Sequence, residues 1–312
     1  MTSRRRFLQT SLLGGVPLLT TAEALAGPLN PRKKRVLRAA HLTDCHILPK
    51  PEAEAALRRV FREVNGMKDR PDLILNTGDT IMDSNGQTRQ TVEERWGTWE
   101  RITQSDNRLP IRSALGNHDE WYAPKGRADE FKSDPRYGKT WAVEVLGMPG
   151  RYYDFEANGW HFVVLDSINR QTGYHLDAEQ MAWLRDRLAA IPAARPVCVL
   201  SHVPILSMGS LMYYVERKPA PEVAFPAYDM HIDAKELKNL FFRHKNVRLA
   251  LSGHIHYVDS VEYLGVTYRC NGAVSGNWWD GVLDEFPPVY ALLDFYADGS
   301  HDCALVAYDA KS

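Results

Sequence analysis

Short apolar runs that end in aspartate, asparagine or histidine recur along this sequence, and this arrangement constrains the fold more than any other feature. Helix-like segments lie between many of the runs, and an alternation of strand and helix predicts an α/β fold built on parallel strands. Ligands bind at the carboxyl ends of the strands in such sheets. The chemistry of this chain is therefore expected at the ends of its strands.

The predicted elements follow from hydrophobic periodicity. Residues 257–308 show strand patterns without a helix, which suggests a second sheet packed on the first. Irregular insertions are expected at about 120–150 and 207–231. Strands are expected at 36–43, 72–76, 110–115, 152–155, 160–166, 196–200 and 247–251, and helices at 52–68, 91–104, 177–190 and 234–244.

Two local signals mark the ends of predicted elements. Ala157-Asn158-Gly159 lies between two strand patterns, and its Asn-Gly pair favours a tight hairpin turn. Asp177 can cap the helix that follows it, and Gln180 stands three residues later, as a capping box requires.

Five polar clusters follow the predicted strands. Asp44 and His46 are two residues apart, so they project to the same side of an extended chain. Each cluster alone has an ordinary structural explanation, such as a turn or a buried histidine. Their occurrence at five equivalent strand ends favours a shared site instead. The candidate residues are Asp44, His46, Asp79 after Gly78, Asn117, His118 and Asp119 after Gly116, His202, and His254 and His256 after Gly253.

In this order the clusters resemble the signature of the metallophosphoesterases, the calcineurin-like superfamily, from about Leu37 to His256. The resemblance implies an α/β fold, an αββα sandwich of two mixed β-sheets flanked by helices, with a dinuclear metal site at the strand carboxyl ends. It assigns Asp44, His46 and His256 to a first divalent ion, and Asn117, His202 and His254 to a second. Asp79 would bridge both ions, and His118 would face the substrate phosphate with Asp119 behind it.

The chemistry of these residue types agrees with that assignment. Mixed nitrogen and oxygen ligands suit Fe, Mn, Zn or Co, and the absence of thiolates argues against a structural zinc site. Two ions joined by a carboxylate can clamp the attacking and leaving oxygens of a phosphoryl displacement, with a metal-activated water as nucleophile. His118 can stabilise charge or protonate the leaving group. There is no P-loop, GxSxG or HExxH motif.

We therefore expect a binuclear metal-dependent hydrolase of phosphate esters. Within the superfamily, the chain looks most similar to exported bacterial phosphodiesterases of the cyclic-nucleotide and glycerophosphodiester type. Met82 stands where purple acid phosphatases of the superfamily carry a tyrosine ligand, so that subfamily is not expected. A phosphomonoesterase and a non-catalytic exported metal-binding protein remain alternatives.

Substrate selectivity must come from segments around the ligands. Trp278 and Trp279 lie in the glycine-rich segment 271–281, where they form either a wall for an apolar leaving group or a plug between the sheets. The insertion at 207–231 is long enough for a lid or a contact between subunits of a homo-oligomer. Few basic residues are available to neutralise a dianionic monoester, with Arg217 and Lys218 as the chief reservation, so a small phosphodiester is favoured.

The amino terminus has the pattern of an export signal. Paired arginines, Arg4-Arg5, precede a mildly apolar stretch, and Ala24-Leu25-Ala26 offers small residues for cleavage. Residues 1–26 are expected to form a twin-arginine signal peptide recognised by that export machinery, and residues 27–312 the mature domain, located in the periplasm or outside the cell. The apolar stretch is too short for a permanent membrane anchor, which needs about 20 residues.

Charge and cysteine content narrow the remaining possibilities. The formal net charge of −1 gives no basic field for binding polymeric nucleic acid. The four cysteines are scattered without a CxxC pair, and they are expected to be mostly reduced core residues. Cys45 in particular should point away from Asp44 and His46, because adjacent residues of a strand face opposite sides.

Overall fold

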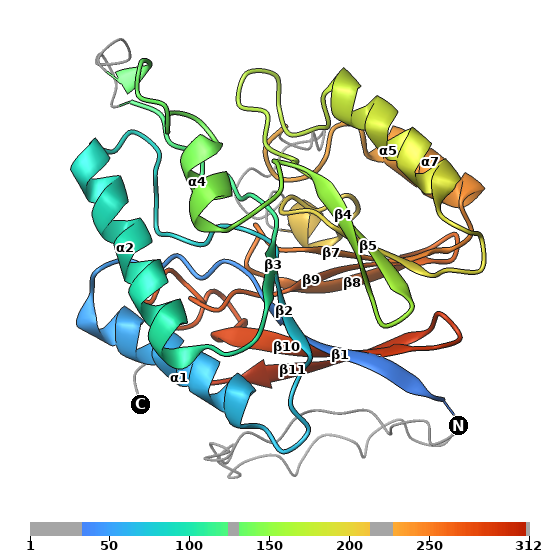
Figure 1. The fold of residues 1–312 in the computed structure, drawn as a ribbon, viewed down its shortest axis with the longest axis horizontal. Helices are drawn as coiled ribbons and strands as arrows, with labels where there is room; N and C mark the ends of the chain where they lie inside the picture. The colour runs from blue at the N-terminus through green and yellow to red at the C-terminus, as the bar shows by residue number, and fades with distance from the viewer. Residues whose placement is uncertain (1–32, 124–130, 213–226, 310–312) are drawn as a thin grey trace, which may run out of the picture.

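A computed structural model describes residues 33–123, 131–212 and 227–309. Two β-sheets pack face to face, and helices cover the outer face of each sheet (Figure 1). This is the predicted αββα arrangement of two mixed sheets. The predicted signal peptide at 1–26 lies outside the described residues, as does the middle of the second insertion.

The first sheet joins the start of the chain to its end. Strands β1, β2 and β3 are parallel, while β10 and β11 pair antiparallel on the other side of β1. Helices α1 (Pro51–Gly66) and α2 (Arg89–Asp106) cover its outer face. The strands in order across the sheet are β11 (His301–Ala307), β10 (Val289–Tyr296), β1 (Arg35–Leu42), β2 (Leu73–Asn76) and β3 (Ile111–Ser113).

The second sheet is formed by the middle of the chain and the segment that follows it. Its four central strands are parallel, and β4 and β8 lie antiparallel at the edges. Helices α5 (Ala178–Ala190) and α7 (Ala234–Arg243) cover its outer face. The strands in order are β4 (Tyr153–Ala157), β5 (Trp160–Val164), β6 (Val197–Leu200), β7 (Val247–Ser252), β9 (Val266–Asn271) and β8 (Val258–Tyr263). Among the described residues, no helix combines the length and apolar character needed to cross a membrane.

The central strands of the second sheet are buried on both faces, which explains why they read as unbroken apolar runs. In β6, Cys198 and Leu200 belong to the core between the sheets, while Val197 and Val199 pack with residues of α5 and α7. Between the sheets, Phe295 of β10 contacts aromatic rings of β5 edge to face at 4.8 and 5.4 Å. Two-sided burial of this kind is typical of parallel strands covered by helices.

The carboxyl-terminal strands differ from the prediction of a separate second sheet. Strands β8 and β9 extend the sheet of β5 to β7, whereas β10 and β11 complete the sheet of β1 to β3. The register runs from Arg35 opposite Tyr296 to His41 opposite Ala291. Alternating hydrophobicity identifies a strand, but it does not identify the strand's partner, and this is why the prediction was wrong.

The first insertion is more ordered than its polar sequence suggested. It contains α4 (Thr140–Val145), whose Trp141 packs against Trp121 with ring centroids 5.2 Å apart. Both rings are buried. Residues 124–130 of this insertion and residues 213–226 of the second insertion, including Arg217 and Lys218, lie outside the described part of the chain.

Both local signals at element ends are found, one of them with a different partner. Asn158 and Gly159 have positive φ, 47° and 90°, in the hairpin between β4 and β5. The carboxylate of Asp177 accepts a hydrogen bond from the Gln180 amide, as a cap should. The Gln180 side chain does not close the capping box. It exchanges hydrogen bonds with the backbone of Asp166 instead, and so fixes the loop after β5.

The four cysteines are free thiols, as predicted. Cys45, Cys198 and Cys270 are buried, and Cys303 is partly buried. Cys45 packs into the apolar core, and it belongs to none of the donor groups that contain its neighbours Asp44 and His46.

Candidate metal centre

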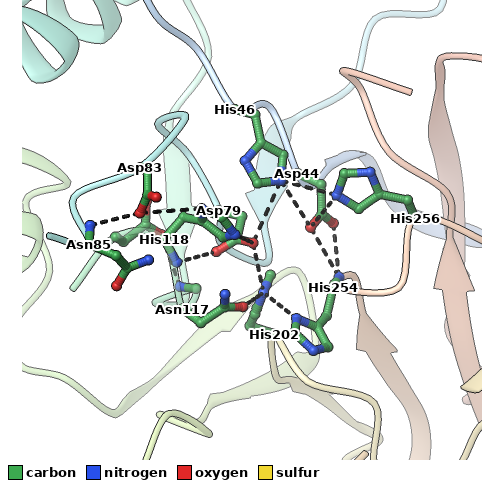
Figure 2. A network of polar contacts seen from close by, with 12 residues as sticks. Asp44, His46, Asp79, Asp83, Asn85, Asn117, His118, His202, His254 and His256 are labelled. Carbon is green, nitrogen blue, oxygen red and sulfur yellow. Dashed lines mark hydrogen bonds and ion pairs between the residues drawn. The ribbon is translucent and has the colours of Figure 1, made fainter. Parts of the chain in front are cut away.

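The seven predicted ligands converge where the carboxyl ends of the two sheets meet (Figure 2). Asp44 and His46 follow β1, Asp79 follows β2, and Asn117 follows β3, so the first sheet supplies four of them. The second sheet supplies the others from the ends of β6 and β7. Parallel strands that end at the same edge bring these residues together although they lie far apart in the sequence.

Three side chains form the first group of donor atoms. His46 Nε2 lies 3.0 Å from His256 Nε2. Asp44 Oδ1 lies 3.4 Å from His256 Nε2 and 3.9 Å from His46 Nε2. All three residues are buried. Their donor atoms point at one small volume, as the ligands of a single ion would.

Four side chains form the second group. His202 Nε2 is its centre, 3.2 Å from Asp79 Oδ2 and 3.0 Å from Asn117 Oδ1. His254 Nδ1 lies 3.2 Å from the same nitrogen. Asp79, His202 and His254 satisfy the spacing of a metal site, and Asn117 adds an amide oxygen.

Asp79 connects the two groups. Its Oδ2 atom lies 3.6 Å from His46 Nε2 in the first group and 3.2 Å from His202 Nε2 in the second. Its other oxygen, Oδ1, accepts a hydrogen bond of 2.7 Å from the backbone amide of His118. The carboxylate is therefore held between the two groups, in the position that a bridging ligand needs.

Backbone carbonyls fix the orientation of three histidines. His202 Nδ1 lies 2.9 Å from Thr77 O, His256 Nδ1 lies 2.7 Å from Gly276 O, and His254 Nε2 lies 2.6 Å from Tyr228 O. A nitrogen that faces a carbonyl carries the proton, so the opposite nitrogen presents its lone pair to the centre.

The backbone at the strand ends is strained in a way that the sequence does not reveal. Five of the seven candidate ligands have positive φ although none is glycine: Asp44 (52°), His46 (42°), Asp79 (50°), His254 (74°) and His256 (58°). This region is uncommon for residues with a Cβ atom, and such strain concentrates at functional sites. The surrounding fold forces the side chains inward.

Two glycines allow the strand ends to approach each other. A Cβ atom on Gly116 would lie 2.0 Å from Asp79 N and 2.2 Å from Asp79 Oδ1. A Cβ atom on Gly253 would lie 2.1 Å from Asp44 Oδ2. Both values are far below any normal contact, so glycine is required beside each carboxylate.

The electrostatics of the group favour a cation. Burial opposes ionisation of Asp79, but the facing His202 and His118 outweigh it and hold the pKa of this carboxyl well below its usual range. Burial also lowers the pKa of His46 to about 3 and that of His254 to about 4. Ionised carboxylates and the neutral rings of His46 and His254 are the protonation states that metal binding requires. His202 differs: burial lowers its pKa, but Asp79 outweighs burial and raises the pKa to about 9, so an ion must displace a proton from this ring.

The predicted catalytic residues have different surroundings from those expected. The Asp119 carboxylate does not lie behind the His118 ring, because it accepts hydrogen bonds from the amides of Thr80 and Gly116, both at 2.9 Å. The carboxylate that faces His118 Nδ1 is Asp83, at 3.5 Å. Asp119 thus fixes the loops after β2 and β3. Asp83 is an ion-pair partner near His118 Nδ1, which forms no hydrogen bond among the described residues.

His118 itself lies at the edge of the centre, beside His46 with ring centroids 4.8 Å apart. Its side chain is 26% exposed, and its Nε2 atom lies 3.9 Å from Asp79 Oδ2. Although burial lowers the pKa of His118, Asp79 and Asp83 outweigh it and raise the pKa to about 9. The ring is a partly exposed proton carrier beside the candidate ligands, and its catalytic role stays a prediction.

The two tryptophans are placed in different environments. Trp278 is 37% exposed, and its ring lies 4.5 Å from that of His256 and 5.9 Å from that of His46. Trp279 is 5% exposed and belongs to the core, with Nε1 donating to the carbonyl of His46 at 2.9 Å. Trp278 thus forms a wall beside the centre. Trp279 is a plug, and its burial argues against the predicted contact with substrate.

The donor set fits divalent metal ions. Each group offers two imidazole nitrogens and at least one oxygen, with no thiolate, as expected for Fe, Mn, Zn or Co. His46 Nδ1 is buried without a hydrogen-bond partner among the described residues, although a ligating histidine commonly has one on its other nitrogen.

Comparisons with known proteins agree with this description. A 3′,5′-cyclic-nucleotide phosphodiesterase of Nostoc sp. is 25% identical over 86% of this chain and 91% of its own length. A probable cyclic nucleotide phosphodiesterase of Synechococcus sp. is 26% identical over 85% of this chain and 89% of its own length. The crystal structure of a dimetal phosphatase from Danio rerio is similar in fold, with a TM-score of 0.57 at 13% identity over 88% of this chain and all of that one.

A model of the calcineurin-like phosphoesterase family matches residues 37–258, which contain every candidate ligand and His118. The match covers most of the chain and both groups of donor atoms. This protein therefore belongs to the calcineurin-like phosphoesterase family.

Proposed function

We propose that this protein is a two-metal hydrolase of small phosphodiesters. The observation that carries the proposal is the position of Asp79, whose Oδ2 atom lies within 3.6 Å of a histidine nitrogen from each group of donor atoms. One carboxylate between two sets of ligands is the arrangement that holds two ions about 3.5–4 Å apart.

The ions would supply the electrophilic part of the chemistry: bound there, they polarise the phosphate and lower the pKa of a coordinated water. Asp44, His46 and His256 would hold one of them, and Asn117, His202 and His254 the other. The protein's contribution is the fixed direction of each donor atom, which carbonyls and glycine contacts provide.

His118 would manage the proton of the leaving group. Asp83 lies 3.5 Å from Nδ1 on one side of the ring, and Nε2 lies 3.9 Å from Asp79 Oδ2 on the side of the centre. A positioned imidazolium can protonate the leaving oxygen, which typically contributes about 10²–10⁴-fold. Its partial exposure allows it to reach a bound ester.

Two observations support a diester over a monoester. The exposed ring of Trp278 gives the centre an apolar wall on which a base or another apolar group of the substrate can rest. Arg170, a basic side chain beside Asn117, is already paired with Glu120 at 2.8 Å and is not free to neutralise a dianion. The names of the Nostoc and Synechococcus relatives point in the same direction.

The test is a substrate panel measured with and without added Mn²⁺ or a chelator. Matched nitrophenyl diesters and monoesters, cyclic nucleotides, glycerophosphodiesters, nucleotides and sugar phosphates should show higher kcat/KM for the diesters. Trp278→Ala should raise KM for aromatic diesters, whereas Trp183→Ala, a partly buried tryptophan that packs on Tyr152, should not. A clear monoester preference contradicts the substrate class.

The metal count has a separate test. Asp79→Asn removes the charge of the shared carboxylate and should lower occupancy of both positions, while His202→Ala should mainly empty one. Elemental analysis of the purified variants distinguishes these results. Full occupancy in Asp79→Asn would exclude the bridging role, and absence of turnover in metal-loaded wild-type protein on the whole panel would exclude the hydrolase.

A further inference from the structure

An arginine outside the predicted set of ligands contacts the metal centre. Arg170 lies in the loop that follows β5, the parallel neighbour of β6. The end of β5 carries none of the candidate metal ligands. The Arg170 side chain is 27% exposed, so most of its surface is covered by the protein.

The guanidinium joins three loops. It donates from Nε to Glu120, from one terminal nitrogen to Tyr122, and from the other to Asn85 and to the backbone carbonyl of Asn117. The distances are 2.8 Å to Glu120 Oε2, 2.9 Å to the Tyr122 hydroxyl and 2.5 Å to Asn117 O. Its Cζ atom also lies 4.1 Å from the centre of the Tyr122 ring. Asn85 follows β2, and the other acceptors follow β3.

The carbonyl of Asn117 is the important acceptor. The side chain of the same residue presents Oδ1 to His202 Nε2 at 3.0 Å, and the amide of the next residue, His118, donates to Asp79 Oδ1 at 2.7 Å. Movement of this turn would therefore displace a ligand of the second group, the proton carrier and the shared carboxylate together.

We propose that Arg170 is a positioning residue that locks the Asn117–His118 turn against the loops after β2 and β5. The planar guanidinium offers five N–H groups in a fixed arrangement, and four of its bonds are formed here, so it acts as a rigid connector. The role in turnover rests on the proposed function, but the effect on metal binding does not.

Geometry and charge predict opposite effects, which makes the proposal testable. Arg170 carries a positive charge beside a cation site, so its removal should strengthen metal binding if charge dominates. The ion pair with Glu120 reduces that repulsion. If the connector role dominates, removal frees the Asn117 carbonyl and metal binding weakens.

The experiment is a calorimetric titration of the metal-free protein with Mn²⁺ alone. Arg170→Met and Arg170→Lys should each weaken binding at the second group by about 10-fold or more, the range found when hydrogen-bond partners of ligands are removed. The lysine substitution keeps the positive charge but removes the planar guanidinium that bonds to several acceptors at once. On diester substrates, kcat should fall with little change in KM.

Arg136→Met is the matched control. Arg136 also forms a two-pronged pair with a carboxylate, Glu144, at 2.7 and 2.9 Å, and lies 5.2 Å from the ring of Trp141. Its side chain has a similar exposure of 33%. The substitution should change the melting temperature without changing Mn²⁺ affinity. If Arg170→Met does not fold, Tyr122→Phe tests the proposal instead. This substitution removes the hydroxyl that accepts a hydrogen bond from Arg170 and keeps the aromatic ring. It should weaken Mn²⁺ binding several-fold.

Three results would overturn the proposal: unchanged or tighter Mn²⁺ binding in Arg170→Met, wild-type affinity in Arg170→Lys, or unchanged affinity in Tyr122→Phe when the methionine variant is unfolded. Failure of the proposed function looks different. In that case the wild type turns over no phosphoester, but Arg170→Met still binds Mn²⁺ more weakly than Arg136→Met does.

Discussion

Alanine at Gly116 should disable the metal centre while most of the fold persists. The new Cβ would lie 2.0 Å from Asp79 N and 2.2 Å from Asp79 Oδ1, about 1.2–1.4 Å short of the 3.4 Å at which ordinary contact begins. Asp79 or the strand end must move by roughly that amount. Overpacking of this kind costs about 1–3 kcal/mol of stability, and a displacement of about 1 Å at a reacting centre costs about 10²-fold in rate.

The matched control is Gly97→Ala. Gly97 lies within α2, and its nearest neighbour beyond the helix backbone would be a flexible arginine nitrogen at 3.7 Å. Alanine should therefore stabilise this helix by about 0.5–1 kcal/mol and leave turnover unchanged.

Three measurements on each variant complete the test: urea unfolding, Mn²⁺ titration and kcat/KM for a generic diester. Gly116→Ala should lose metal affinity and rate together. Wild-type metal affinity and rate in this variant would refute the claim that the two strand ends touch at Asp79.

Three further predictions address catalysis, stability and location. His118→Ala should keep its metal content and lose about 10²–10⁴-fold in kcat, and a normal kcat at full occupancy would remove His118 from the mechanism. Burial favours the neutral acid at Asp106, but hydrogen bonds from a serine and two arginines outweigh it and lower the pKa to about 2. Asp106→Asn should therefore cost about 1 kcal/mol of unfolding free energy at pH 7, after allowance for solvent screening. That stabilisation is present above the unfolded-state pKa and is lost as pH falls toward 2, so a gap of constant size in urea unfolding between pH 7 and pH 3 would contradict it. Replacing Arg4 and Arg5 by lysine should leave the precursor in the cytoplasm, and continued processing in cell fractions would exclude the twin-arginine signal.

The strands, the helices and the set of candidate ligands could be predicted because their signals are local. Apolar periodicity identifies β1, β2 and β7 directly. Each candidate ligand comes within a few residues of the end of its strand, so the same local stretch of sequence reveals both. The motif order then groups Asp44 with His256 and Asn117 with His202, as the structure does.

The partners of the catalytic residues could not be predicted in the same way. Asp83 faces His118 only because the loop after β2 turns back beside the end of β3, and no local pattern reports that turn. Asp119, the adjacent carboxylate, was the nearer choice in sequence, yet its oxygens are occupied by backbone amides. Arg170 was missed for the same reason, since its acceptors are 48–85 residues away.

The two tryptophans show a second limit. Trp278 and Trp279 are neighbours of one type, so composition cannot assign different roles to them. Both have positive φ, 47° and 73°, and this sharp turn directs one ring to the metal centre and the other into the core. Only the backbone conformation explains why Trp278 lines the metal centre while Trp279 is buried in the core.

The position of β10 beside β1 has a consequence for synthesis of the chain. Arg38 on β1 pairs at 2.6 Å with Asp294 on β10, a residue 256 positions later. Until that late segment has been translated, β1 keeps an unpaired edge and the first sheet stays open. Contacts of such long range form slowly and leave an exposed edge in the meantime. The first sheet, whose strand ends carry Asp44, Asp79 and Asn117, is thus completed only near the end of translation. A twin-arginine route, which moves proteins after they have folded, would suit this order of assembly.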